Sequence, residues 1–165
     1  MFSDAITHMD VIRHRARRGF TLLELMCATA VAALLLAVAV PSYRASIVRA
    51  EIRQCVNDLL HLSMAIEQYR TMHGMQPPLS LDELSGVPLT DPWGNPYRFL
   101  NFTSGAPGVQ GKIRKDHNLH PLNSSFDLYS TGPDGESAPP LTAKSSQDDI
   151  IWARDGSYVG VASEY

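Results

Sequence analysis

The strongest pattern along the chain is an apolar run close to its start. Residues 20–40 read FTLLELMCATAVAALLLAVAV and contain a single charged side chain, that of Glu24. A helix of about 20 apolar residues is long enough to cross the hydrocarbon core of a bilayer, which is about 30 Å thick. The pattern therefore predicts a transmembrane helix over residues 20–40.

A second helical pattern follows Pro41. Apolar residues recur at spacings of three to four, the period of one helix face, and polar residues occupy most positions between them. These apolar residues are Ile52, Cys55, Val56, Leu59, Leu62, Ile66, Tyr69 and Met72. Gly74 is a stop signal at the end of the pattern. We expect one long helix from about Phe20 to His73, bent at Pro41, whose distal half (residues 41–73) covers a sheet with its apolar stripe.

Residues 74–165 have the short alternations and turn formers of a small β domain. Residues 80–83 fit a capping box that opens a very short helix. Residues 97–102 and 126–130 are typical of strands, and a middle strand is expected around Val109–Arg114. Together with the helix, these segments predict an α+β fold in which a small antiparallel sheet packs on the distal half of the helix.

Charged residues are distributed unevenly about the apolar run. The first 19 residues have a net charge of +2, which leaves −5 for the rest of a chain whose formal total is −3. Arginines beside an apolar run hold that end of a membrane helix in the cytoplasm. A nucleic-acid-binding arm is the alternative for these arginines, but the acidic body lacks a basic patch, so no nucleic-acid partner is expected. The arginines are Arg13, Arg15, Arg17 and Arg18.

The two cysteines, Cys27 and Cys55, both fall in the predicted helix. At about 1.5 Å of rise per residue they would lie roughly 40 Å apart, too far for a disulfide. Two cysteines are also too few ligands for a zinc site. We interpret them as small apolar residues that fill space.

Glu24 is the residue that ordinary membrane segments do not explain. A secretory signal peptide has an apolar stretch of only about 7–15 residues and then a small-residue cleavage site, which is missing before Pro41. A plain single-pass anchor fits the length but gives no reason for the acid. A carboxylate within a membrane costs at least about 2.5 kcal/mol, so it is a candidate functional residue, with a snorkelling surface residue as the alternative.

The segment Arg17-Arg18-Gly19-Phe20-Thr21-Leu22-Leu23-Glu24 resembles the class III signal of type IV pilins and type II secretion pseudopilins. The resemblance implies that a prepilin peptidase cuts between Gly19 and Phe20 and methylates the new terminus at Phe20. A leader of residues 1–19 would be removed, and the apolar helix kept. It also implies that Glu24 meets the terminal amine of a neighbouring subunit. Two charges that are costly alone in lipid are tolerable as a pair, so the pair would set the register between subunits.

Three patches of the remaining chain narrow the resemblance. Asp91-Pro92-Trp93-Gly94-Asn95-Pro96-Tyr97, the stretch from Phe126 to Gly135 (FDLYSTGPDG) and Asp148-Asp149-Ile150 are similar to segments of the major pseudopilin of type II secretion. The resemblance implies the type IV pilin-like fold, with a globular head over residues 74–165. It also implies polymerisation with copies of itself and other pseudopilins into a periplasmic rod that drives protein export across the outer membrane. An inner-membrane assembly platform would be a partner. The protein would then be a single-pass protein of the bacterial inner membrane, with its N-terminus cytoplasmic and its head periplasmic.

The same resemblance implies a calcium ion in the last loop. The implied ligands are the carbonyl of Thr131 and the carboxylates of Asp134, Asp148 and Asp149, and such oxygens suit calcium, which takes about six to eight of them. Thirteen residues separate Asp134 from Asp148, more than is usual in the family. A solvated acidic loop without metal is therefore the alternative. The tail from Ile151 to Tyr165 has no clear counterpart in the family.

Two other functions compete with the secretion pseudopilin. A type IV pilus subunit, major or minor, would serve adhesion, motility or DNA uptake, but the chain lacks the C-terminal cysteine pair of many such subunits. A membrane-anchored enzyme is disfavoured because no G-x-S-x-G, H-E-x-x-H or phosphate-loop pattern occurs, so we expect a non-enzymatic protein. Either Met1 or Met9 can be the translation start. The sequence fits both a major subunit of the rod and a rarer one.

Overall fold

The computed structural model describes residues 19–117 and 119–165, so the predicted leader lies outside the described residues except for Gly19. The described chain divides into two compact units, one that ends at Ser42 and one that comprises Tyr43–Tyr165. The elements in chain order are α1 (Leu22–Met72), η1 (Leu81–Glu83), β1 (Arg98–Asn101), β2 (Phe126–Ser130), η2 (Lys144–Ser146), β3 (Ile150–Ala153), β4 (Tyr158–Val161) and η3 (Ala162–Glu164).

In the first unit, α1 presents an apolar surface that no other described residue covers. Every residue from 19 to 42 is exposed, and Phe20 and Leu34 have 83% and 71% of their surface accessible. This helix is long and apolar enough to cross a membrane. Apolar surface on this scale must be buried by lipid or by other helices. The beginning of α1 is therefore consistent with a single membrane span.

The helix α1 continues without interruption through Pro41, which confirms the prediction of one long helix. The bend expected at Pro41 stays a prediction. At its C-terminus the backbone N–H of Met75 donates to the carbonyl of Arg70 at 2.7 Å, and Gly74 has a φ angle of +64°. Glycine is favoured in this left-handed conformation, so Gly74 acts as the expected stop.

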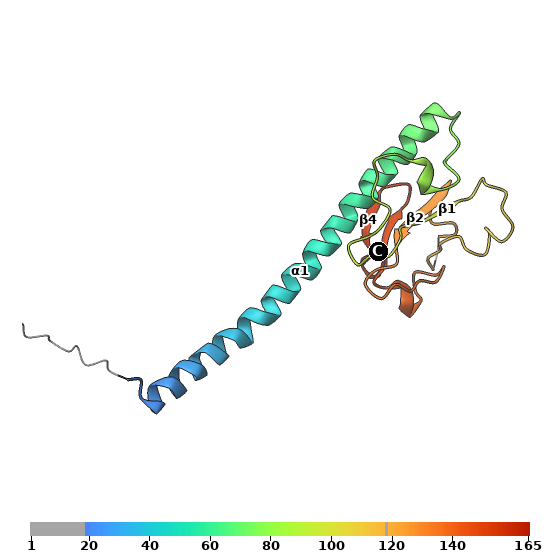
Figure 1. Ribbon diagram of the computed structural model, residues 1–165. Helices are drawn as coiled ribbons and strands as arrows, with labels where there is room; N and C mark the ends of the chain where they lie inside the picture. Colours follow the sequence, from blue (N-terminus) through green and yellow to red (C-terminus); the bar gives the residue numbers. More distant parts are fainter. Residues whose placement is uncertain (1–18, 118) are drawn as a thin grey trace, which may run out of the picture. The chain divides into compact units, whose positions relative to one another are not determined.

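The second unit contains a four-stranded antiparallel sheet in the order β1-β2-β3-β4. Leu128 on β2 pairs with Phe99 on β1 and with Trp152 on β3, and Trp152 pairs with Val159 on β4. Residues that are paired across neighbouring strands lie on the same face of a sheet. This row packs with the distal part of α1 in one apolar cluster, and Figure 1 shows this part of α1 beside the strands. The predicted α+β fold is confirmed.

The apolar stripe of α1 forms the core only as far as Ile66. Leu59, Leu62 and Ile66 have no accessible surface, and burial of each such side chain contributes about 1.5–3 kcal/mol. Tyr69 is half-buried, but Met72 is 70% exposed, so its predicted place in the stripe was wrong. The reason is that the last turn of α1 contacts η1 instead of the sheet, through a 2.6 Å hydrogen bond from the Tyr69 hydroxyl to Glu83.

One prediction about the sheet needs correction. The segment Val109–Arg114 is not a strand, because the chain forms turns and a bend there. The backbone N–H of Arg114 donates to the Asp127 carboxylate at 2.6 Å, so it is not available to a strand ladder. The tail from Ile151 to Tyr165, for which the resemblance offered no counterpart, supplies most of β3 and all of β4, and these two strands pair as half of the sheet.

Candidate functional site

The predicted cleavage bond lies in an accessible segment before α1. Phe20 is almost fully exposed, and apart from the immediate chain neighbours no described residue lies within 4 Å of the position of a Cβ on Gly19. Gly19, Phe20, Thr21 and Glu24 line one open surface pocket. The arginines that precede Gly19 in the signal lie outside the described residues. Among the described residues, none covers this bond.

Glu24 lies in the first turn of α1. Its backbone N–H donates to the hydroxyl of Thr21 at 3.2 Å, so Thr21 caps the helix. A carboxylate in the first turn is stabilised by the positive end of the helix dipole. None of the salt bridges among the described residues involves Glu24. In the part of the chain that the structure describes, the acid therefore has a helix dipole beside it but no ion-pair partner.

In the head, Asp91 organises the turn of the D-P-W-G-N-P-Y segment. Its Oδ1 accepts the backbone N–H groups of Trp93 at 3.1 Å and Asn95 at 2.8 Å, and its Oδ2 accepts the Ser130 hydroxyl of β2 at 2.5 Å. Asn95 donates in turn to the carbonyl of Gly132 at 2.9 Å. Two of the three patches that carry the resemblance therefore meet in one hydrogen-bonded cluster.

The same turn holds the head to α1. The Trp93 indole N–H donates to Glu51 at 3.1 Å, and the Tyr97 hydroxyl donates to Asp58 at 2.9 Å. Beside them, Cys55 is buried, and burial raises the pKa of its thiol to about 11. Burial likewise raises the pKa of Tyr97 above its ordinary value. The neutral thiol and phenol act here as packing and donor groups.

Asp149, one of the predicted calcium ligands, is turned toward an arginine. It has no accessible surface, and its Oδ2 lies 2.5 Å from an Nη atom of Arg114 and accepts the Ser137 hydroxyl at 2.7 Å. Its Oδ1 has no hydrogen-bond partner among the described residues. Burial raises the pKa of Asp149, while the Arg114 guanidinium opposes this shift.

The other predicted ligands do not complete a metal site around Asp149. Asp148 accepts the backbone N–H of Asp134 at 3.4 Å, so these two residues lie together. Asp134 also accepts the N–H of Glu136 at 2.8 Å, as in a local turn, and the buried Thr131 hydroxyl has no described partner. Across the described residues, no group of three or more His, Cys, Asp and Glu side chains is placed to hold a metal ion. The arrangement does not fit the predicted four-ligand calcium site.

A second buried carboxylate, Asp127, fixes the position of Arg114. It accepts the backbone N–H of Arg114 at 2.6 Å and the side-chain amide of Asn123 at 3.0 Å. Burial raises the pKa of Asp127 to about 6, although these donors and the charge of Arg114 act in the opposite direction. Arg114 and Ser137 were missed by sequence reasoning. Their only signal was an arginine inside a segment that was expected to pack as a strand.

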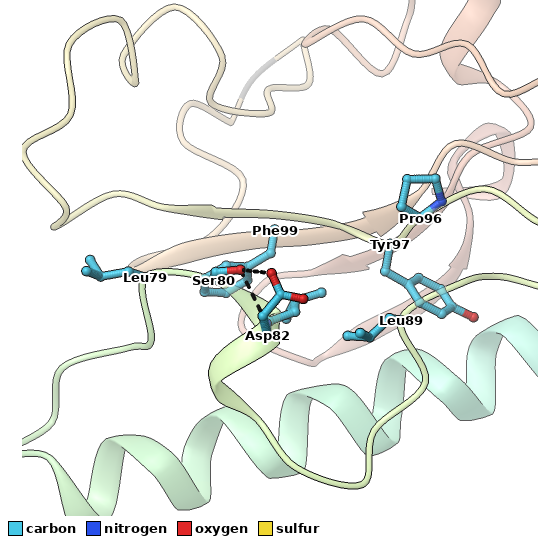
Figure 2. A pocket seen from close by; sticks show the side chains of 8 residues that line it. Leu79, Ser80, Asp82, Leu89, Pro96, Tyr97 and Phe99 are labelled. Atoms are coloured by element: carbon cyan, nitrogen blue, oxygen red, sulfur yellow. Dashed lines mark hydrogen bonds between the residues drawn. The ribbon is translucent and has the colours of Figure 1, made fainter.

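A pocket between η1 and the start of β1 offers no catalytic arrangement (Figure 2). Ser80 accepts the backbone N–H of Asp82 at 3.2 Å and donates to its carboxylate at 2.9 Å, so it is the capping residue of η1. The lining has no histidine or cysteine to act as base or nucleophile. Its residues are Leu79, Ser80, Leu81, Asp82, Leu89, Pro96, Tyr97 and Phe99.

Comparison with protein families gives one match at the N-terminus. Residues 14–40 match the prokaryotic N-terminal methylation motif. This range includes the predicted cleavage bond and Glu24. No solved structure matches the chain significantly.

Comparison with characterised proteins extends the similarity to most of the chain. Type II secretion system core protein G of Aeromonas hydrophila is 28% identical over 145 residues, which cover 76% of this chain and 89% of that protein. Its counterpart in Escherichia coli K12 is 29% identical over 141 residues, covering 73% and 84%. The counterpart in Vibrio cholerae is 27% identical over 141 residues, covering 74% and 84%.

Proposed function

We propose that the chain, which is similar to type II secretion system core protein G over about three quarters of its length, is a pseudopilin that polymerises into the periplasmic rod of that system. Its role is structural and not enzymatic. The similarity to core protein G favours this role over that of a type IV pilus subunit. The work of the protein is then assembly: subunits leave the bilayer, and their apolar helices pack together.

The apolar beginning of α1, which no other described residue covers and which has one acid in its first turn, is the observation that carries the proposal. Cleavage between Gly19 and Phe20 would create an α-amino group four residues before Glu24. In an array of parallel helices, that amine can meet the Glu24 carboxylate of an adjoining subunit. The pair removes the penalty of two isolated charges in an apolar environment, and a shift in register would restore that penalty. Glu24 thus acts as the register residue.

Membrane placement and partners follow from the same reasoning. The arginines before Gly19 keep the leader in the cytoplasm, where a prepilin peptidase cuts the chain and methylates Phe20. The helix then holds the protein in the bacterial inner membrane with the head in the periplasm. Other pseudopilins and an inner-membrane assembly platform are the partners that extraction and polymerisation require.

Calcium has no step in the proposed function. The resemblance implies the ligands Thr131, Asp134, Asp148 and Asp149, but Asp149 is paired with Arg114. Asp134 and Asp148 alone supply fewer oxygens than the six to eight that calcium takes. We therefore derive assembly from the helix and the head without a metal ion.

Variants at Glu24 test the proposal. Glu24→Ala removes the charge and should spare cleavage and insertion, since it lowers the cost of burying the helix, yet it should abolish most rod assembly. Glu24→Gln should do the same, because an amide cannot neutralise an amine. Glu67→Ala, which removes an exposed acid of the same helix, is the matched control and should assemble normally.

Assembly is measured by shearing and pelleting of rods from cells that overproduce the subunit, and insertion by extraction of membranes with carbonate. Rods formed in normal amount by Glu24→Ala would contradict the register role. Loss of assembly in Glu67→Ala as well would show that the assay does not distinguish Glu24 from other acids of the helix.

A further inference from the structure

We propose that the guanidinium of Arg114 takes the structural role of a calcium ion in the β2–β3 loop, Thr131–Asp149, so that the head is closed by an internal ion pair and folds independently of calcium. The inference concerns the stability of the head. It holds whether or not the bond between Gly19 and Phe20 is cut, so the two proposals can fail separately.

The β2–β3 loop is long, so contacts are needed to hold it in one conformation. Its 19 residues join two strands that are directly paired, and its only regular element is η2, of three residues. Loops longer than about 12–15 residues with little structure of their own are uncommon in compact domains. Hydrogen bonds within the loop, such as the one from the Asp134 N–H to Asp148, and contacts from outside the loop must therefore hold it in place.

Arg114 makes such contacts from outside the loop. One Nη atom donates to the Ser137 hydroxyl and, at 3.2 Å, to the carbonyl of Ala138. The other Nη atom donates to Asp149 at 2.5 Å. The guanidinium carbon lies 4.2 Å from the centroid of the Tyr129 ring on β2. A single side chain thus contacts the middle of the loop, its end and the strand before it.

Burial and backbone hydrogen bonds fix the position of Arg114. Its side chain is only 2% exposed. Its backbone N–H is held by Asp127, and its carbonyl accepts the N–H of Leu122 at 3.0 Å. Ser137, which receives one guanidinium bond, also donates to the same Asp149 oxygen that the guanidinium contacts. Arg114, Ser137 and Asp149 therefore form a closed triangle of hydrogen bonds.

Arg114 and a calcium ion would compete for Asp149. Only Oδ1 of this carboxylate is without a partner among the described residues. A calcium ion bound to Oδ1 at about 2.3–2.6 Å would lie within roughly 6 Å of the guanidinium. Two cations that close repel strongly where water is excluded, and both Arg114 and Asp149 are buried. Release of Arg114 would instead leave its buried charge unpaired. The ion pair thus excludes calcium from the position that the family resemblance assigns to it.

Melting of the full-length chain in detergent micelles tests the inference. Both tryptophans of the chain, Trp93 and Trp152, lie in the head, so their fluorescence reports the unfolding of the head alone. We expect the same melting temperature in millimolar calcium chloride and in excess EGTA. A melting temperature that falls when EGTA removes calcium would overturn the proposal.

Variants separate the ion pair from simple packing. Arg114→Met should lower the melting temperature by roughly 10–20 °C in both media, because it leaves Asp149 buried without a counter-ion. Arg114→Met combined with Asp149→Asn should regain at least half of that loss, since no unpaired charge remains. Arg98→Met, which removes an exposed arginine of β1, is the control and should melt like the parent.

The double variant keeps the test decisive if Arg114→Met alone does not fold. Folding of the double variant beside an unfolded single variant supports the ion pair. A double variant as unstable as the single variant, or an Arg114→Met head that melts like the parent, overturns it. Rods that fail to assemble while the chelator has no effect on melting would count against the proposed function and not against this inference.

Discussion

Replacement of Asp91 by alanine should destabilise the head more than the loss of any exposed acid. The Asp91 carboxylate accepts three hydrogen bonds, from the backbone of Trp93 and Asn95 and from the Ser130 hydroxyl. It is 6% exposed, so water cannot readily replace it for these donors. Asp91→Ala therefore leaves three donors without an acceptor and releases the turn that links α1 to β2.

The size of the effect follows from the number and kind of these bonds. A hydrogen bond to a charged group contributes about 1.5–3 kcal/mol, and bonds to one carboxylate are not additive, so we expect a loss of about 3–5 kcal/mol. Asp91→Asn keeps one oxygen for the two backbone N–H groups and should cost only about 1–2 kcal/mol. Domains of this size have a total stability of about 5–15 kcal/mol, so the alanine variant would be marginal.

Urea unfolding of the full-length chain in a non-ionic detergent, followed by tryptophan fluorescence, measures these differences. Asp82→Ala removes an exposed acid of η1 and serves as the control, with an expected change below about 1 kcal/mol. An Asp91→Ala variant within 1 kcal/mol of the parent would refute the reasoning. So would an Asp91→Asn variant as unstable as the alanine variant, because the loss would then not come from the backbone donors.

Three further predictions concern the head. The Cys55 thiol is buried and its pKa is raised to about 11, so it should react slowly with a water-soluble maleimide at pH 8. In a Cys27→Ser chain, in which Cys55 is the remaining cysteine, we expect labelling only after denaturation. Fast labelling of the native Cys27→Ser chain, detected by mass spectrometry, would contradict this prediction. The pKa of Asp127 is raised to about 6 in the folded state from 3.8 in the unfolded chain, so the folded state binds the proton more tightly. The free energy of unfolding, measured with urea, should therefore increase by about 1 kcal/mol as the pH falls from 7.5 to 5. If the stability of the Asp127→Asn variant depends on pH as that of the parent does, the pH dependence comes from another group. Leu62→Ala should lower the free energy of unfolding by about 2–5 kcal/mol because Leu62 is fully buried, whereas Met72→Ala should lower it by less than about 0.5 kcal/mol because Met72 is exposed. Equal urea midpoints of the two variants would show that α1 is packed differently.

Periodicity predicted the elements whose environment is simple. The apolar stripe of α1 could be predicted because one face of the helix packs on the sheet over several turns. The strand β2 could be predicted because turn-forming residues lie directly before and after it. Met72 was assigned to the core because periodicity does not report where the covering sheet ends. The residues of β3 are all buried, so they show no alternation, and Gly160 interrupts the side-chain pattern of β4.

The pairing of Arg114 with Asp149 could not be predicted from one sequence. The two residues are 35 positions apart, and both are of types that are almost always exposed unless paired. Their contact depends on the path of two loops, which periodicity does not describe. The Glu24 region differs in this respect, because a lone acid in an apolar run is conspicuous by composition alone. Thr21 followed three residues later by Glu24 is also a capping signal that could have been read from the sequence.

The intact mass of the chain extracted from membranes of cells that contain a prepilin peptidase tests the central claim most directly. We expect a mature chain that begins at Phe20 and carries one added methyl group, since only such a chain presents an amine to the Glu24 of an adjoining subunit. A chain that keeps its first 19 residues in those cells would contradict the account, because the cation that Glu24 requires would not exist.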